Sequence, residues 1–289
     1  MIQHCRPSYA ATLRTKWVDR LVLRPTTDPL DAGEQQRIPL RTADGQALDR
    51  FVYAKGPLTA NTPSPALLVL KLPGTAGRAE RSTPLPANFF RQLTSEVWTW
   101  NPPGYGGSSG KASLLNLPEA ALQFFDQTVS QRSNPQTIVW VFGNSLGCSS
   151  ALYLASQRSR ISGLILRNPP PLQQTIAHVA RLGRPRLLHP WLDRFSAWLG
   201  HGIPPALDAL QTAPRARVPA VFLSAQMDTL VPPALQTQIF DAYAGPKQMV
   251  RWRDMLHDDL PDETHLKQFA NAANWLLRQA RDRGPDPES

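Results

Sequence analysis

Ser145 lies at the centre of the pentapeptide Gly143-Asn144-Ser145-Leu146-Gly147, which has the spacing of a nucleophile turn. An apolar run, 137–142, precedes it, and a helix-prone stretch, 148–155, follows it. This order predicts a strand, a sharp turn and a helix, with the serine hydroxyl lifted clear of the sheet and the flanking glycines admitting neighbouring backbone. Because a serine hydroxyl alone is a weak nucleophile, covalent catalysis also requires a base, an acid that orients the base, and an oxyanion site.

His257 is the histidine whose position best fits a general base. It lies in a loop just after a late predicted strand, 248–252, from which an imidazole can reach the carboxyl edge of a sheet. The remaining histidines lie near the N-terminus, in the helical segment 170–215, or inside the predicted last helix, and they are His4, His178, His189, His201 and His265. The alternative for the His-Asp-Asp run is an ordinary solvated loop.

Asp228 is the favoured orienting acid, because it follows the predicted strand 220–224 and precedes a Pro-Pro helix start. Its alternative role is that of a turn former or helix cap. The third part is the loop Leu72-Pro73-Gly74-Thr75-Ala76-Gly77, which follows the first buried strand. We expect the backbone N–H groups of Thr75 and Leu146 to converge on a developing oxyanion, the alternative being a simple Pro-Gly turn.

The elements that must position these residues alternate between strands and helices. Strands are predicted at 66–72, 96–100, 137–142, 161–166, 220–224 and 248–252, and helices at 116–129, 146–158, 233–243 and 263–281. A hairpin with an Asp44-Gly45 turn joins 37–42 to 47–53. This pattern predicts an α/β fold with a mainly parallel sheet covered by helices on both faces. The expected organisation is an extension over 1–36, one domain over 37–281 and a disordered tail over 282–289.

The segment 170–215 interrupts the alternation and is predicted to be a short helical lid insertion. Trp191, Phe195 and Trp198 fall at i, i+4 and i+7, which places them on one helical face. Two interpretations stay open. The aromatic face packs the segment onto the main domain, or it lines an entrance and contacts the acyl chain of a substrate.

Over residues 37–281 the chain resembles serine hydrolases of the α/β-hydrolase superfamily, which share its order of serine, acid and histidine. The loop 101–110, Asn-Pro-Pro-Gly-Tyr-Gly-Gly-Ser-Ser-Gly, and the His-Asp-Asp run at 257–259 resemble the depalmitoylase-like and prolyl-peptidase-related branch. The resemblance implies a nucleophile at Ser145, an acid at Asp228, a base at His257, and no metal or organic cofactor. One departure is Pro73, where many members carry histidine.

Composition sets further limits. The chain of 289 residues is 42% hydrophobic, its apolar runs are strand-sized, and its N-terminus lacks the apolar core of a secretory signal, so a cytoplasmic protein is expected. Two cysteines cannot form a disulfide framework; Cys148 is expected to pack in the core, and Cys5 lacks a lipidation motif. The net charge of +9 comes without a basic, aromatic-interleaved stripe, so no nucleic-acid partner is expected. Peripheral contact with an anionic membrane stays open.

The sequence therefore predicts a serine hydrolase that cleaves a carboxylic ester or thioester of a small-molecule or acylated substrate. The first alternative is a serine peptidase acting on short peptides. The second is a catalytically idle hydrolase scaffold that serves as a binding protein.

Overall fold

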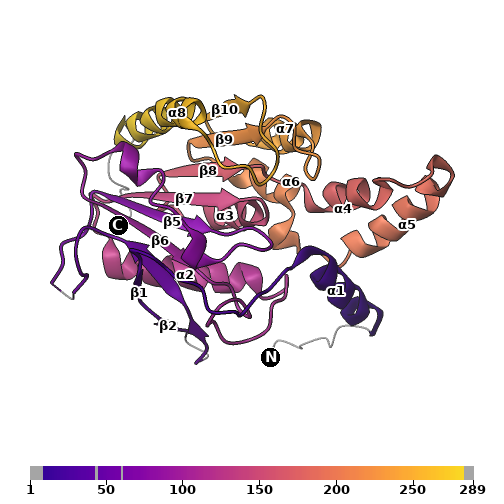
Figure 1. Cartoon of the computed structure of the whole chain (residues 1–289), viewed down its shortest axis with the longest axis horizontal. Coiled ribbons are helices and arrows are strands. Elements are labelled where there is room, and N and C mark those ends of the chain that lie inside the picture. Colours follow the sequence, from indigo (N-terminus) through magenta and orange to yellow (C-terminus); the bar gives the residue numbers. More distant parts are fainter. Residues whose placement is uncertain (1–8, 43–44, 60, 283–289) are drawn as a thin grey trace.

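An eight-stranded sheet forms the centre of the molecule (Figure 1), in the order β1-β4-β6-β5-β7-β8-β9-β10. The computed structural model describes residues 9–42, 45–59 and 61–282. Neighbouring strands run parallel from β6 through to β10, whereas β4 is antiparallel to both β1 and β6. The strands are β1 (Gln36–Arg37), β4 (Arg50–Tyr53), β5 (Leu67–Leu72), β6 (Ser95–Trp100), β7 (Ile138–Asn144), β8 (Gly163–Arg167), β9 (Ala220–Ala225) and β10 (Lys247–Trp252).

The predicted hairpin is present as a separate two-stranded sheet, in which β2 (Leu40–Arg41) pairs antiparallel with β3 (Ala47–Leu48). Asp44 of its predicted turn lies outside the described residues. The central strands are apolar on both sides, and the side chains of 67–70 in β5 are fully buried. Such continuous apolar runs are typical of parallel strands covered on two faces.

Helices cover both faces of the sheet and create two apolar layers. On one face lie α2 (Leu117–Arg132), α3 (Leu146–Gln157) and α7 (Pro233–Ala242), which contribute to the larger buried cluster. On the other face, α8 (Glu263–Asp282) buries one apolar stripe, including Phe269, Ala273 and Leu276, against β5, β7 and β9. The prediction of a mainly parallel sheet covered on both faces is therefore confirmed.

The segment after β8 divides into two structurally different parts. The helices α4 (Leu172–Arg181) and α5 (His189–Gly200) form an arm that projects from the body of the molecule (Figure 1). The short α6 (Ala209–Thr212), with its flanking 3-10 turns, packs on α3, and Leu207, Ala209 and Ala213 are fully buried. The structure thus places the second half of the predicted 170–215 insertion in the main helical layer.

The N-terminal helix α1 (Tyr9–Val22) lies beside α5 of the arm (Figure 1). Val18 of this helix is fully buried, so the segment predicted as an extension contributes to the core. Cys5 and residues 283–289 of the predicted disordered tail lie outside the described part of the chain, whereas Asp282, the first residue of that tail, ends α8. Among the described helices, none combines the length and the apolar character required to cross a membrane.

Candidate active site

Ser145 occupies a strained turn between β7 and α3. Its φ of 50° places a non-glycine residue in the left-handed region, which is the conformation expected of a nucleophile at the tip of such a turn. The two flanking glycines are required by close contacts. A Cβ at Gly143 would lie 2.6 Å from the Cα of Cys148, and a Cβ at Gly147 would collide with the carbonyl of Leu72. The predicted strand–turn–helix geometry is present.

His257 bridges the other two predicted polar residues of the site. Its Nε2 lies 3.0 Å from Oγ of Ser145, and its Nδ1 lies 2.6 Å from Oδ2 of Asp228. With a protonated Nδ1 donating to the carboxylate, Nε2 carries the free lone pair that accepts the serine proton. The structure therefore brings Ser145, His257 and Asp228 together, although the last two are 112 and 83 residues away from the serine in the chain.

The Asp228 carboxylate is fixed by the turn in which it lies. Its Oδ1 accepts hydrogen bonds from the backbone N–H groups of Leu230, at 2.9 Å, and Val231, at 2.8 Å. The Gln236 side chain donates to Oδ2 from 3.2 Å. Asp228 thus acts as a turn former while its Oδ2 faces His257, and the two interpretations drawn from the sequence hold together.

Asn168 supports the histidine loop, a role that the sequence did not indicate. It is fully buried directly after β8, and its side chain bonds to the backbone of His257 and of Ala225 at 2.9 Å each. Its φ of 50° is a conformation that asparagine adopts more readily than most residues. An asparagine before a run of prolines at a strand end was the signal that could have indicated a specialised turn.

The loop after β5 lies against the nucleophile as predicted. A Cβ at Gly74 would lie 3.3 Å from the Cβ of Ser145, so the two turns are in close contact. The carbonyl of Thr75 accepts hydrogen bonds from the Tyr105 hydroxyl, at 2.7 Å, and from the backbone N–H of Arg24, at 3.0 Å. These bonds fix the peptide between Thr75 and Ala76, which adjoins the peptide that carries the Thr75 N–H. Leu146 is the first residue of α3, so its N–H has no partner within the helix and is available to an oxyanion.

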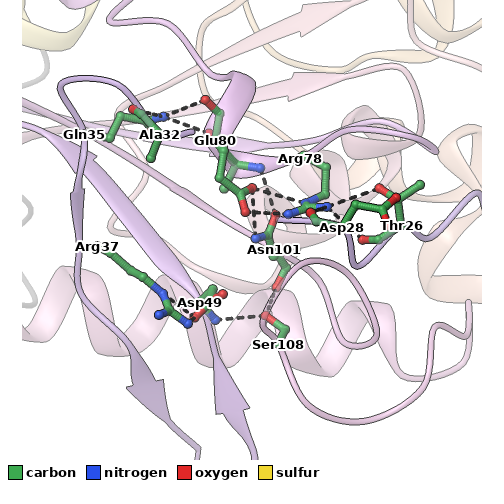
Figure 2. A network of polar contacts seen from close by, with 11 residues as sticks. Thr26, Asp28, Ala32, Gln35, Arg37, Asp49, Arg78, Glu80, Asn101 and Ser108 are labelled. Carbon is green, nitrogen blue, oxygen red and sulfur yellow. Dashed lines mark hydrogen bonds and ion pairs between the residues drawn. The ribbon is translucent and has the colours of Figure 1, made fainter. Parts of the chain in front are cut away.

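A buried polar network anchors the far end of the same loop (Figure 2). Arg78 and Glu80 form an ion pair whose side chains are 1% and 7% exposed. Arg78 also donates to the carbonyls of Thr26 and Asp28, and Asn101 donates to Glu80 from 3.1 Å. The network ties the loop after β5 to the N-terminal segment and to the loop after β6, which the sequence had not indicated.

A cavity of about 540 Å³ opens beside the serine. Ser145, His257 and Thr75 line it, together with apolar side chains that include Phe142, Trp252, Leu260 and Phe269. Among the described residues, those that line this cavity do not include Trp191, Phe195 or Trp198. The three aromatic residues lie on α5 of the arm, where Trp191 is 72% exposed and Trp198 packs on the core. Their contact with substrate stays a prediction.

Burial also confirms the expectation for Cys148. Its thiol is fully buried, contacts the carbonyls of Gly143 and Arg167, and has a pKa raised well above its usual range by desolvation. A thiol in this state is a packing residue and not a nucleophile.

Comparison with known proteins yields distant relatives. No protein-family model matches the chain. An uncharacterized protein of Mycobacterium tuberculosis is 26% identical over 245 residues, which cover 83% of this chain and 80% of the relative. The protein bem46 of Schizosaccharomyces pombe is 28% identical over 217 residues, which cover 74% and 68% of the two chains.

Several solved structures with the same architecture are named as esterases. Acetyl xylan esterase 1 from Thermoanaerobacterium superposes with a TM-score of 0.60 at 13% identity, over 94% of both chains. An esterase from Pyrococcus furiosus superposes with a TM-score of 0.60 at 14% identity, over 90% of this chain and 97% of the esterase chain. These superpositions and the strand order show that the chain has the α/β-hydrolase fold, as the sequence predicted.

Proposed function

We propose that the protein is a serine hydrolase that cleaves a carboxylic ester or thioester through an acyl-enzyme on Ser145. The observation that carries the proposal is the continuous chain of contacts from Ser145 Oγ to His257 and from His257 to the buried Asp228. The contact between the loop after β5 and the nucleophile turn adds an oxyanion site. A serine, a base, an orienting acid and oxyanion donors are together the set that acyl transfer requires.

The first half of the reaction forms the acyl-enzyme. Nε2 of His257 accepts the Ser145 proton while Oγ attacks the substrate carbonyl, whose π electrons move onto oxygen. The N–H groups of Thr75 and Leu146 stabilise that oxyanion, and one such donor typically contributes about 3 kcal/mol. As the tetrahedral intermediate collapses, the bond to the alcohol or thiol breaks and His257 transfers its proton to the leaving group.

The second half repeats these steps with water. His257 removes a proton from a water molecule, hydroxide adds to the acyl carbonyl, and the oxyanion again lies against the same two N–H groups. Collapse releases the carboxylic acid, and His257 returns the proton to Ser145. Throughout, Asp228 holds the Nδ1-protonated tautomer and stabilises the imidazolium that forms twice per turnover.

The substrate class rests on chemistry and on fold neighbours. The apolar side chains that line the cavity beside Ser145 suit an acyl group, and several solved structures that superpose on the chain are named as esterases. A panel of 4-nitrophenyl esters, thioesters and aminoacyl amides separates this proposal from a peptidase. Because serine peptidases also cleave activated esters, enzymatic cleavage of the aminoacyl amides themselves would favour the peptidase.

The decisive experiment is Ser145→Ala with a fluorophosphonate probe. We expect kcat to fall by about four orders of magnitude or more and labelling to disappear. The matched control is Ser156→Ala, which removes a hydroxyl from the same helix, where it bonds to the Tyr153 carbonyl. Unchanged labelling of Ser145→Ala would refute the nucleophile assignment. Absence of labelling in the unmodified protein would favour an idle scaffold.

A further inference from the structure

Two of the cationic side chains that line the catalytic cavity come from strands of the central sheet, and the acyl-transfer steps use neither. Lys71 lies near the end of β5, and Arg167 is the last residue of β8. Lys71 interrupts, and Arg167 ends, a run of apolar residues of the kind typical of buried strands. Burying a charged side chain at such a position costs free energy unless the charge is paired and hydrogen-bonded.

The register places these two cations on either side of the nucleophile strand. Lys71 pairs with Phe142 of β7, and Arg167 pairs with Asn144, the residue before Ser145. Both share the sheet face of the cluster that α8 covers, because they alternate in step with Val69 and Ile165. Two strand spacings separate their backbones by about 10 Å across the sheet. Long side chains from these positions flank the space beside the serine.

The aromatic rings and hydrogen-bond acceptors that each cation contacts are neutral groups. The Lys71 ammonium lies 5.3 Å from the Phe142 ring centroid and donates to the carbonyl and hydroxyl of Thr83. The Arg167 guanidinium lies 5.7 Å from the Trp252 ring centroid and donates to the carbonyl of Asp259. Within the described residues, neither forms an ion pair with a carboxylate, and the Arg167 Nε is buried without a hydrogen-bond partner.

The surrounding charges leave the cavity positive. Arg78 and Arg81 also line it, and Arg78 is paired with Glu80. Asp258 is the acidic residue of the lining, and its carboxylate is exposed. Burial, reinforced by the charge of Arg167, lowers the pKa of Lys71 to about 7. Burial also lowers the pKa of Arg167, and the carboxylates of Asp258, Asp259 and Asp228 partly offset this effect. Two like charges in one partly desolvated cavity repel each other, and an anion between them would offset that cost.

We propose that Lys71 and Arg167 bind an anionic group, a carboxylate or a phosphate, that the substrate carries at a distance from its scissile carbonyl. This inference rests on the proposed hydrolase function and narrows it to esters or thioesters with a negatively charged acyl or leaving group. The planar guanidinium supplies directional donors and the ammonium a compact charge, a combination that suits an oxyanion. The competing structural role for Arg167 is to anchor the histidine loop through Asp259.

The test compares matched substrates. The 4-nitrophenyl hemiester of glutaric acid carries a terminal carboxylate, 4-nitrophenyl pentanoate is its neutral counterpart, and a 4-nitrophenyl ester with a terminal phosphate forms the third arm. At pH 7 we expect kcat/KM for at least one anionic ester to exceed that of the neutral ester tenfold or more. The ratio of kcat/KM for the carboxylate ester to kcat/KM for the phosphate ester identifies the preferred anionic group.

Variants separate charge recognition from loop anchoring. Arg167→Gln retains an N–H donor for the Asp259 carbonyl but removes the charge, and Lys71→Met retains length. We expect each to lower the anionic-to-neutral ratio at least tenfold, whereas Arg167→Lys keeps most of it. The control Arg251→Gln, at an exposed position of β10, should leave the ratio unchanged.

Two results would overturn the inference. One is equal kcat/KM for the charged and neutral esters in the unmodified enzyme, a measurement that does not depend on whether the variants fold. The other is an equal loss on both substrates in folded Arg167→Gln and Lys71→Met, which would assign these residues to loop support. In either case, labelling of Ser145 and cleavage of the neutral ester would leave the proposed function intact.

Discussion

Asn168 holds the backbone of the histidine loop, since its Nδ2 donates a hydrogen bond of 2.9 Å to the carbonyl oxygen of His257. Its Oδ1 accepts from the backbone N–H of Ala225, and its own N–H donates to Leu223. One fully buried side chain therefore joins the ends of β8 and β9 to the loop that carries the base. The 3.0 Å contact between His257 and Ser145 depends on that loop position.

Asn168→Asp tests this relationship. Aspartate tolerates the left-handed backbone and still accepts from Ala225, but it cannot donate to the His257 carbonyl and places a charge beside it. We expect kcat to fall about 10- to 100-fold with KM changed less than threefold, because a misplaced base slows chemistry more than binding. The pH profile of kcat/KM should shift as well, since the new carboxylate lies near the imidazole.

The matched control is Asn274→Asp on the exposed face of α8, where the side chain bonds to a helix carbonyl. It should leave both kcat and the pH profile unchanged. Full activity of folded Asn168→Asp would show that the histidine loop is fixed by other contacts, such as the one between Arg167 and Asp259.

Tyr105→Phe tests the support of the oxyanion loop. The Tyr105 hydroxyl is buried and bonds to the Thr75 carbonyl at 2.7 Å and to the Arg24 N–H at 3.2 Å. Removing it leaves the Arg24 N–H as the remaining partner of the Thr75 carbonyl and loosens the loop that carries the Thr75 N–H, so we expect kcat to fall about tenfold with KM nearly constant. The free energy of unfolding should fall by about 1 kcal/mol, because the Thr75 carbonyl and the Arg24 N–H each lose one of their two hydrogen-bond partners.

Tyr243→Phe is the control that separates loss of activity from loss of stability. Its hydroxyl bonds to the Val218 carbonyl on the side of the sheet that α7 covers, and it is equally buried. We expect a similar loss of stability by chemical denaturation and no change in kcat. Equal losses of activity in both variants would mean that the effect of Tyr105→Phe is general destabilisation.

The sequence was sufficient to predict the parts of the site that depend on local pattern and on chain order. The turn at Ser145 follows from a strand, a glycine-flanked serine and a helix in succession, and Asp228 and His257 each follow a recognisable strand. These signals involve neighbours in the chain. The same locality explains why the predicted strands lie within a few residues of the observed ones.

Contacts between distant segments that support the site could not be predicted in this way. Tyr105 reaches Thr75 only because β6 lies beside β5 in the sheet, and no spacing in the sequence encodes that register. Lys71 and Arg167 did carry a signal, a lone cation in an apolar strand, but their convergence on one cavity requires the strand order. The arm could not be distinguished from the core by periodicity, because both are amphipathic helices.

Glu80→Gln tests the buried network of Figure 2 through pH. Burial opposes ionisation of Glu80, but hydrogen bonds from Arg78 and Asn101 outweigh it, so the net pKa lies below the ordinary 4.5. A lowered carboxyl pKa stabilises the fold above pH 4.5, and this contribution is lost as the pH falls through the folded-state pKa. Glutamine also leaves the buried Arg78 without its counter-ion.

At pH 7 we therefore expect Glu80→Gln to lower the free energy of unfolding by about 3 kcal/mol, measured by urea denaturation. The difference in the free energy of unfolding between Glu80→Gln and the unmodified protein should become smaller as the pH falls below 4.5. Glu263→Gln removes an exposed partner of Lys267 and should cost less than 1 kcal/mol at any pH. A difference for Glu80→Gln that does not depend on pH would contradict the ionic role.

The projecting arm exposes a large apolar surface together with basic residues. Leu187 and Trp191 are 77% and 72% exposed, and Phe195 is 47% exposed on the same arm. The exposed arginines of this segment are Arg181, Arg184, Arg186 and Arg194. Exposed apolar side chains rimmed by cations are typical of surfaces that insert into the headgroup layer of anionic membranes.

We expect the purified protein to co-sediment with vesicles that contain 30% phosphatidylglycerol, and this binding to weaken in 0.5 M NaCl. Trp191→Ser combined with Phe195→Ser should reduce it at least fivefold without changing the thermal midpoint appreciably, because both side chains are exposed. Leu115→Ser, a 56% exposed apolar residue in the loop before α2, is the control and should bind normally. Unchanged vesicle binding, accompanied by a selective loss of activity on long-chain soluble esters, would instead support the lid interpretation drawn from the sequence.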